Sequence, residues 1–190
     1  MRIFLAGAAG VLGRALIPHL TADEVVGLTR SHHKAGLLER LGVVPVVADA
    51  YDSERLLQAV VDARPDVVVN FLTDLTAGSS ELNAKIRREI GPALVAAAEA
   101  ASARRLVVES VAWPLEGASA EALSVLEGSA LGSNLDALVI RFGRLWGPGT
   151  WHAEPPEPPR VRIDDAGRRA AELIAAGSTG VQIVASAFQD

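Results

Sequence analysis

The chain has 190 residues, of which 49% are apolar and 22% are charged, and its formal net charge is −5. This size and balance predict one globular domain over residues 1–190 with its own core. The acidic balance argues against nucleic acid or an anionic membrane surface as a partner, and the lack of cysteine excludes disulfides, thiolate catalysis and cysteine-bound metals. No apolar run reaches about 18 residues, and the N-terminal stretch is not a signal peptide, so we expect a cytoplasmic protein.

The first expected strand, Arg2–Ala6, runs directly into the turn Gly7-Ala-Ala-Gly10-Val-Leu-Gly13 and then into a helix. In such a unit the first glycine permits the tight turn, and the second lets the backbone approach a pyrophosphate. The third lets the helix pack closely on the strand. The helix N–H groups and the helix dipole then favour the phosphates. This opening predicts a bound dinucleotide.

Apolar strands alternate with helical stretches along the rest of the chain. The runs 67–69 and 138–140 are apolar on both alternations, which is typical of strands buried on both faces of a parallel sheet. Ser53 is expected to cap a helix. The alternation predicts an α/β fold, a doubly wound parallel-sheet Rossmann fold with about seven strands. The expected strands are Arg2–Ala6, Glu24–Leu28, Val43–Ala48, Asp66–Phe71, Arg105–Glu109, Ala137–Phe142 and Val181–Val184. The expected helices are Val11–Leu20, Lys34–Leu41, Ser53–Ala63, Ser80–Ala101, Ala118–Leu131 and Asp164–Ala176.

The end of the second expected strand bears on the choice of cofactor. NAD-selective sites place an acid there to bind the ribose 2′-hydroxyl, whereas this chain has Arg30 and Ser31, with Lys34 behind them. A guanidinium with hydroxyl support suits a 2′-phosphate, so the sequence favours NADP, with NAD as the alternative. Arg30 and Lys34 could otherwise simply solvate the start of a helix.

Residues 146–160, WGPGTWHAEPPEPPR, differ in character from the rest of the chain. Prolines cannot continue a strand ladder or a helix interior, so we expect an extended loop. One interpretation is a surface connection with a stiff proline spacer. The other is a lid over the cofactor that carries Trp151 and His152, because loops beyond the carboxyl ends of the strands bind ligands in such folds.

Seven segments together carry a family resemblance. They are the turn Gly7–Gly13, Asp49-Ala50, Val69-Asn-Phe-Leu72, Arg88-Glu-Ile-Gly-Pro92, Val107-Val-Glu-Ser-Val111, Arg141-Phe-Gly-Arg-Leu-Trp-Gly-Pro-Gly149 and Ile163-Asp-Asp-Ala166. In these segments the chain resembles an atypical member of the extended short-chain dehydrogenase/reductases, the NAD-dependent epimerase/dehydratase superfamily. The resemblance covers essentially the whole chain and implies a Rossmann fold that binds NAD(P).

The resemblance also implies roles for individual residues. Ser110 occupies the place of the family's active-site serine or threonine, and the Asp49 carboxylate would accept a hydrogen bond from the adenine amino group. Together with the cofactor argument above, the expected cofactor-binding residues are Gly7, Ala9, Gly10, Val11, Leu12, Gly13, Arg30, Ser31, Asp49, Ala50, Asn70, Phe71 and Leu72.

The family's proton-transfer pair is absent from this chain. Family enzymes use Tyr-x-x-x-Lys, but Tyr51 is the one tyrosine and Lys34 and Lys85 are the two lysines, so no such pair exists. The places of the pair fall within residues 119–127, where Ser, Ala, Leu or Val cannot act as a tuned phenol. The candidate catalytic groups are Ser110, Glu116 and His152, with Asp74 as a further replacement. For Glu116, His152 and Asp74 the alternative is a loop, exposed or capping role.

Three features of the sequence bear on the substrate, on metal binding and on a second copy of the chain as partners. The sequence between the sixth strand and the final helix-strand unit holds only a loop of about fifteen residues, 146–160, so the substrate domain is much reduced and any substrate is small or bound partly by another subunit. No metal site is expected, because His32 and His33 are adjacent and lack acids at ligand spacing. Alanines 93, 96, 97 and 100 suit either close helix packing in a homodimer or packing on the sheet.

Three functional hypotheses follow from these features. The first is a divergent NADP-dependent oxidoreductase or isomerase acting on a small carbonyl compound, with the Ser110 hydroxyl and water stabilising the alkoxide. The second is a catalytically silent NADP-binding sensor or interaction protein. The third is a vestigial dinucleotide site.

Overall fold

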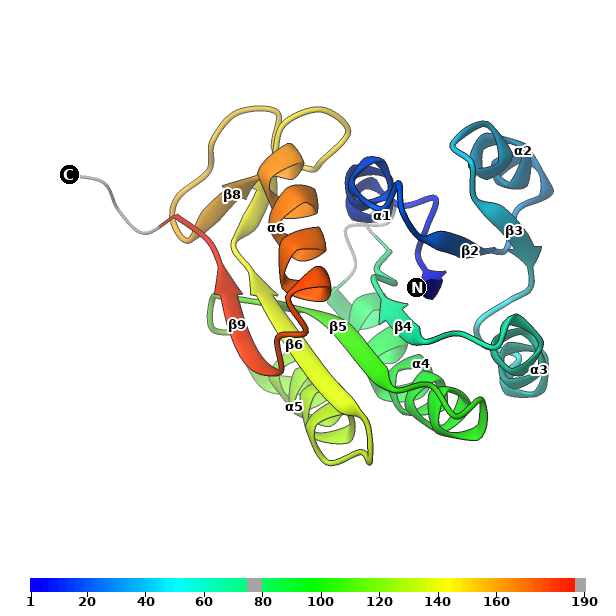
Figure 1. Ribbon diagram of the computed structural model, residues 1–190. Helices are drawn as coiled ribbons and strands as arrows, with labels where there is room; N and C mark the ends of the chain where they lie inside the picture. The colour runs from blue at the N-terminus through cyan, green and yellow to red at the C-terminus, as the bar shows by residue number, and fades with distance from the viewer. Residues whose placement is uncertain (75–79, 187–190) are drawn as a thin grey trace.

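The computed structural model describes residues 1–74 and 80–186, and its centre is a seven-stranded sheet (Figure 1). The strands of this sheet are β1 (Arg2–Ala6), β2 (Glu24–Thr29), β3 (Val44–Val47), β4 (Val67–Asn70), β5 (Arg105–Val111), β6 (Asp136–Phe142) and β9 (Gly180–Val184). They lie in the order β3-β2-β1-β4-β5-β6-β9, and every neighbouring pair is parallel. The predicted doubly wound parallel sheet is confirmed.

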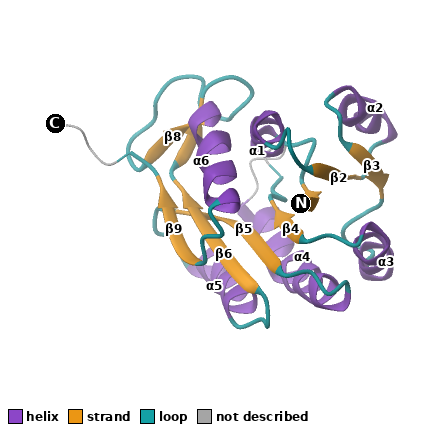
Figure 2. Cartoon of the chain, viewed as in Figure 1, coloured by secondary structure: helices purple, strands orange, loops and turns teal. Residues whose placement is uncertain are grey.

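Helices cover both faces of the sheet (Figure 2). They are α1 (Val11–Leu16), α2 (His32–Arg40), α3 (Ser53–Ala63), α4 (Ser80–Ala100), α5 (Gly117–Leu131) and α6 (Ile163–Ala175), with a short 3-10 turn η1 (Ile17–His19) after α1. Helices α1, α2 and α6 pack on one face, and α3, α4 and α5 pack on the other. None of the helices in the described part of the chain is long and apolar enough to cross a membrane.

The sheet divides the apolar core into two halves. Successive side chains of a strand point to opposite faces, so Ile3 and Leu5 of β1 join the core under α1 and α6, while Phe4 and Ala6 join the core over α3 and α4. All four are completely buried. Strands buried on both faces explain the apolar runs in the sequence.

Helix ends differ from the expected ones for local chemical reasons. The first helix was expected to reach Leu20 but ends at Leu16, because Pro18 has no N–H to continue it and the chain tightens into η1. The second helix begins at His32, with Ser31 as its N-cap. Ser53 was expected to cap the third helix; instead the carboxylate of Asp52 accepts from the N–H of Arg55 at 3.1 Å, and Ser53 is the first helical residue.

Two short strands, β7 (Arg144–Trp146) and β8 (Arg160–Arg162), were not expected from the sequence. They pair in parallel and bracket the proline-rich segment, so this loop is fixed at both of its ends. Figure 2 shows it as a long connection beyond the carboxyl ends of the strands. Three-residue strands are too short to show a periodic pattern, which is why the sequence did not reveal them.

The alanine stripe of α4 is divided between core and surface. Ala97 is buried, Ala93 packs partly on the core, and Ala96 and Ala100 are exposed. Helix α4 packs along α5, where Gly91 of α4 meets Leu126 of α5. The stripe therefore contributes in part to the core, and a homodimer through this face stays a prediction.

Candidate dinucleotide site

A cavity of about 430 Å³ lies over the glycine turn. From β1 the chain first adds β2 and β3 on one side of the sheet and then crosses to add β4, β5 and β6 on the other side. This is the topological switch point at which open α/β sheets bind ligands. Of the residues expected to bind the cofactor, all line the cavity except Gly13 and Asn70. The remaining lining residues are Arg14, Leu28, Thr29, Lys34, Leu37, Ala48, Tyr51, Thr73, Asp74, Ile86, Ile90, Glu109 and Leu145.

The glycine turn has the shape that a pyrophosphate requires. Gly7 has φ +91°, and a Cβ there would collide with the carbonyl of Phe71. A Cβ on Gly13 would lie 2.8 Å from the carbonyl oxygen of Ala8, so Gly13 serves close packing instead of lining the cavity. A Cβ on Gly10 would meet only the backbone of Gly7, at 3.0 Å, and would otherwise fill open space in the cavity. The residues present therefore fit a dinucleotide.

Charged and aromatic side chains gather at the end of the cavity formed after β2 and β3. The guanidinium of Arg30 lies 3.4 Å from the carboxylate of Asp74, and the Arg30 side chain is 69% exposed. The Asp49 carboxylate accepts from the N–H of Tyr51 at 3.1 Å. The hydroxyl of Tyr51 is buried without a hydrogen bond, while the Nζ of Lys85 lies 4.9 Å from its ring centre. This end combines an aromatic wall with a cationic rim.

The opposite end of the cavity is formed by residues that follow β4 and by β5. Asn70 is buried, and its side-chain oxygen accepts from the N–H of Leu72 at 3.2 Å, so Asn70 shapes the turn that brings Phe71 and Leu72 to the cavity. The ring of Phe71 packs edge-on against Phe142, with centroids 6.1 Å apart.

Glu109, near the end of β5, also lines this opposite end of the cavity. Burial raises the pKa of its carboxyl to about 7, and the positive charge of Arg87 opposes the rise. The sequence interpretation overlooked Glu109. The signal that could have found it is a carboxyl that interrupts an otherwise apolar buried strand.

Ser110 lies next along β5 but points to the other face. It is completely buried, and its hydroxyl donates to the Glu127 carboxylate at 2.5 Å. The same carboxylate receives two hydrogen bonds from Arg141 of β6, at 2.9 and 2.6 Å. Burial alone would raise the pKa of Glu127, but the hydrogen bonds from Arg141 and Ser110 outweigh it and hold the pKa below its ordinary value.

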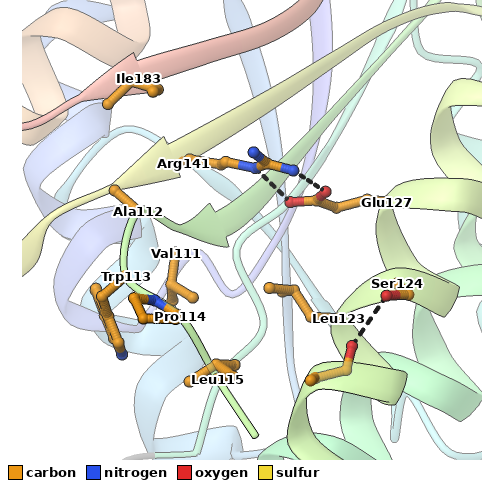
Figure 3. A pocket seen from close by; sticks show the side chains of 11 residues that line it. Val111, Ala112, Trp113, Pro114, Leu115, Leu123, Ser124, Glu127, Arg141 and Ile183 are labelled. Carbon is orange, nitrogen blue, oxygen red and sulfur yellow. Dashed lines mark hydrogen bonds and ion pairs between the residues drawn. The ribbon is translucent and has the colours of Figure 1, made fainter.

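Glu127 and Arg141 of this Ser110–Glu127–Arg141 network line a second cavity of about 350 Å³ (Figure 3). Figure 3 shows the guanidinium of Arg141 facing the Glu127 carboxylate, with Trp113 and Leu115 from the loop after β5 on the other side. Apart from the hydroxyl of Ser124, the other side chains that line this cavity are apolar. The lining residues are Val111, Ala112, Trp113, Pro114, Leu115, Ala120, Leu123, Ser124, Glu127, Arg141 and Ile183.

The structure does not bring the three candidate catalytic residues together. Glu116 is exposed at the N-cap of α5 and makes no capping bond there. His152 lies in the proline-rich loop, where its carbonyl accepts from the N–H of Gly147. Neither residue lines the dinucleotide cavity, and nor does Ser110. Among residues 1–74 and 80–186, no three His, Asp or Glu side chains are grouped so that they could hold a metal ion.

The proline-rich loop approaches the glycine turn without covering the cavity. Leu145, just before the loop, lines the cavity, whereas no residue of 146–160 does. A Cβ on Gly149 would lie 3.6 Å from the guanidinium of Arg14, so the loop begins beside α1. Trp151 is 68% exposed. The loop thus lies near the cavity in an open arrangement, and the lid stays a prediction.

A switch-point cavity over a glycine turn is the architecture of a dinucleotide-binding protein. Residues 7–145 match a family of proteins described as NAD(P)H-binding, and the chain belongs to this family. The predicted NAD(P) cofactor is confirmed at this level.

Similar proteins agree with this class. The chain is 37% identical over 183 residues to a 3-diazoavenalumate denitrifying reductase from Streptomyces sp, an alignment that covers 80% of this chain and 59% of the reductase. The chain therefore spans less than two thirds of that relative. The fold matches the enzyme WbmH of Bordetella bronchiseptica, whose structure contains NAD+, with a TM-score of 0.78 at 19% identity, covering 97% of this chain and 75% of WbmH.

A putative NAD-dependent epimerase/dehydratase from Bacillus halodurans has the same TM-score of 0.78 at 20% identity, covering 95% of this chain and 91% of that one. At these identities the two structures show a shared fold. They confirm that the fold is the one predicted from the resemblance.

Proposed function

We propose that this chain forms the cofactor-binding part of an NADPH-dependent reductase that transfers a hydride to a small electrophile. The observation that carries the proposal is the switch-point cavity over Gly7–Gly13, with Arg30 on its rim. When bound, the reduced nicotinamide supplies the hydride. The chain's own residues position the dinucleotide and shape the space in which the acceptor lies.

The preference for NADPH rests on Arg30. The side chain is mostly exposed and holds Asp74 only through one long contact of 3.4 Å, and surface pairs of this kind contribute little. A 2′-phosphate carries more charge than a carboxylate and binds a guanidinium bidentately. Arg30 is therefore positioned to turn from Asp74 to the phosphate, while the Ser31 hydroxyl, which accepts from Lys34 N–H at 3.4 Å, caps the adjoining helix.

Affinities for NADPH and NADH test this assignment. A charge-assisted hydrogen bond contributes about 1.5–3 kcal/mol, so Arg30→Ala is expected to weaken NADPH binding by roughly 10- to 100-fold. NADH binding should change less than about threefold, since NADH has no 2′-phosphate. Arg40→Ala, on the exposed last turn of α2 and outside the cavity, serves as the matched control. Equal losses for NADPH and NADH in the Arg30 variant would contradict the role of Arg30.

The missing Tyr-x-x-x-Lys pair favours a particular kind of hydride acceptor. A carbonyl needs a proton on its oxygen after the hydride arrives, whereas a cationic diazonium group does not. Hydride addition to its terminal nitrogen gives a neutral diazene, which releases N2 and leaves a C–H bond in place of the C–N bond. The similar Streptomyces protein is named as a reductase of a diazo compound. A diazonium compound therefore suits this chain better than the small carbonyl compound considered from the sequence.

The second cavity is the space we assign to the body of the acceptor. Strand β5 contributes Glu109 to the dinucleotide cavity and Val111 to the second cavity, so both cavities lie at the carboxyl end of β5. The walls are mostly apolar, and Arg141 offers N–H donors to an anionic substituent. This cavity is small, which agrees with a small substrate.

Turnover with two classes of acceptor tests the proposed reaction. Purified protein with NADPH is offered an arenediazonium carboxylate and, separately, a panel of small aldehydes and ketones, and NADPH absorbance and N2 release are followed. We expect stoichiometric N2 release with the diazonium compound. Leu123→Trp, which fills the second cavity, should lower kcat/KM at least tenfold with unchanged NADPH affinity. Tight NADPH binding without turnover of any acceptor would contradict a reductase and leave the silent-binder alternative.

A further inference from the structure

Glu109 is an unusual side chain for its place in the fold. It lies in β5 between Val108 and Ser110, and strands β4 and β6 pair with β5 on either side. Its neighbour Ser110 forms a hydrogen bond with α5, whereas Glu109 lines the dinucleotide cavity. Among the described residues no hydrogen bond to the Glu109 carboxyl is found. Glu109 is partly buried and opens onto the cavity, in a strand whose neighbouring residues are almost all buried and apolar. A carboxyl in such a strand is uncommon, so its presence calls for a role.

The position of Glu109 relates it to one half of a bound dinucleotide. Arg30 and Asp49 mark one end of the cavity, beyond β2 and β3, and the glycine turn after β1 marks its middle. Glu109 is on β5, two strands from β1 on the opposite side, which is about 10 Å at the usual strand spacing. With the adenosine at the end marked by Arg30 and the pyrophosphate over the turn, Glu109 lies beside the nicotinamide half.

We propose that the Glu109 carboxyl faces the nicotinamide ring and releases its proton to solvent when the ring becomes oxidised. A bound reduced nicotinamide would supply the hydride with both electrons and would become singly positive. The carboxyl changes from neutral to singly negative, and its proton passes to water. In the fraction of molecules whose carboxyl is protonated beforehand, the net charge of ring and carboxyl stays zero, and the ionised carboxyl stabilises the positive ring. This inference rests on the proposed function.

The charges around Glu109 are suited to such an exchange. Burial raises the pKa of its carboxyl to about 7, and Arg87 of α4 is the charged group whose field acts against this rise. The elements α6, β4 and β6 contribute no charged residue to the lining of the cavity. Helix α1 contributes one charged lining residue, Arg14. The other charged lining residues, Arg30, Lys34, Asp49 and Asp74, come from the segments after β2, β3 and β4. A carboxyl with a pKa near 7 is about half protonated at pH 7, so a nearby positive ring can displace its proton.

Proton counting during cofactor binding tests the proposal without any substrate. Calorimetric titrations of NADP+ and NADPH in two buffers of different ionisation enthalpy give the number of protons released. If the oxidised ring lowers the pKa of Glu109 by one unit, NADP+ binding at pH 7 releases about 0.4 proton more than NADPH binding does. The affinity for NADP+ relative to that for NADPH should then rise about eightfold between pH 5.5 and 8.5. The 2′-phosphate, which also titrates near pH 6, is common to both forms and cancels.

Three variants test whether the released proton comes from Glu109. Glu109→Gln is expected to abolish the difference between NADP+ and NADPH in proton count, and its far-ultraviolet circular dichroism checks that it folds. Arg87→Gln should move the midpoint of the affinity ratio to higher pH, an effect that a purely structural Glu109 would not produce. Glu121→Gln, on the exposed face of α5, is the matched control and should behave as the parent chain.

The possible failures of the proposal are distinguishable. Tight binding of both cofactor forms with the same proton count in the parent chain and in Glu109→Gln would overturn the role of Glu109 and leave the proposed function standing. Failure of both NADP+ and NADPH to bind would overturn the proposed function and this inference together.

Discussion

Replacement of Glu127 by leucine is expected to destabilise the protein by about 2–4 kcal/mol. The substitution removes the carboxylate that accepts from the completely buried Ser110 hydroxyl at 2.5 Å and from Arg141 at 2.9 and 2.6 Å. The stranded Ser110 hydroxyl costs about 1–3 kcal/mol. The Arg141 side chain, at 40% exposed, can regain water and adds less.

The assay is urea denaturation followed by circular dichroism, with Ser110→Ala and the double variant completing a mutant cycle. The double variant has no stranded hydroxyl, so it should be more stable than the sum of the two single effects predicts by about 1–2 kcal/mol. For a chain of this length, a loss of about 3 kcal/mol corresponds to a fall in Tm of roughly 6–12 °C.

Acid titration adds an independent check on Glu127. Its pKa in the folded chain is held below the ordinary value, so its stabilising contribution is present above about pH 4.5 and is lost as the pH falls through the folded pKa. The stability gap between the parent chain and Glu127→Gln should therefore shrink on acidification below pH 4.5. A Glu127→Leu chain within 0.5 kcal/mol of the parent, or an additive mutant cycle, would refute the reasoning.

Three further outcomes are expected. Gly13→Val should lose NADPH binding and lower Tm, because its side chain would collide with the carbonyl of Ala8; unchanged melting curves and titrations would contradict this. The folded pKa of Glu109, about 7, lies above the unfolded value of about 4.3. The stability present below pH 4.3 therefore falls by roughly 4 kcal/mol as the pH rises from 4.3 through 7. Glu109→Gln should escape this loss in urea denaturation from pH 5 to 8, and parallel curves would count against it. If residues 146–160 close as a lid, Trp151 emission should shift to the blue with NADPH in a chain carrying Trp113→Phe and Trp146→Phe, and no shift would exclude closure over Trp151.

The sequence predicted the sheet because its signals are local. Apolar runs such as Val67–Val69 and the spacing of Gly7, Gly10 and Gly13 reflect burial on both faces and a backbone approach that depends only on neighbouring residues. The same holds for Phe71 and Leu72, which follow a strand and so come to the carboxyl edge.

The Ser110–Glu127–Arg141 network could not be predicted in the same way. The three residues come from β5, α5 and β6, and 17 positions separate Ser110 from Glu127. Ser110 was considered as a catalytic group from its place in the strand, and only the packing of α5 shows that its hydroxyl is already engaged. The sequence shows Glu109 as a carboxyl within an apolar strand. The face of the sheet to which its side chain points depends on how β5 pairs with its neighbours, which the sequence does not give.

Titration of the parent chain with NADPH, NADP+, NADH and NAD+ by calorimetry tests the central claim most directly. Binding of the two 2′-phosphorylated forms at micromolar concentration, with the other two at least tenfold weaker, is the predicted result. Absence of binding by all four dinucleotides would contradict the assignment of the cavity over Gly7–Gly13 as a working cofactor site.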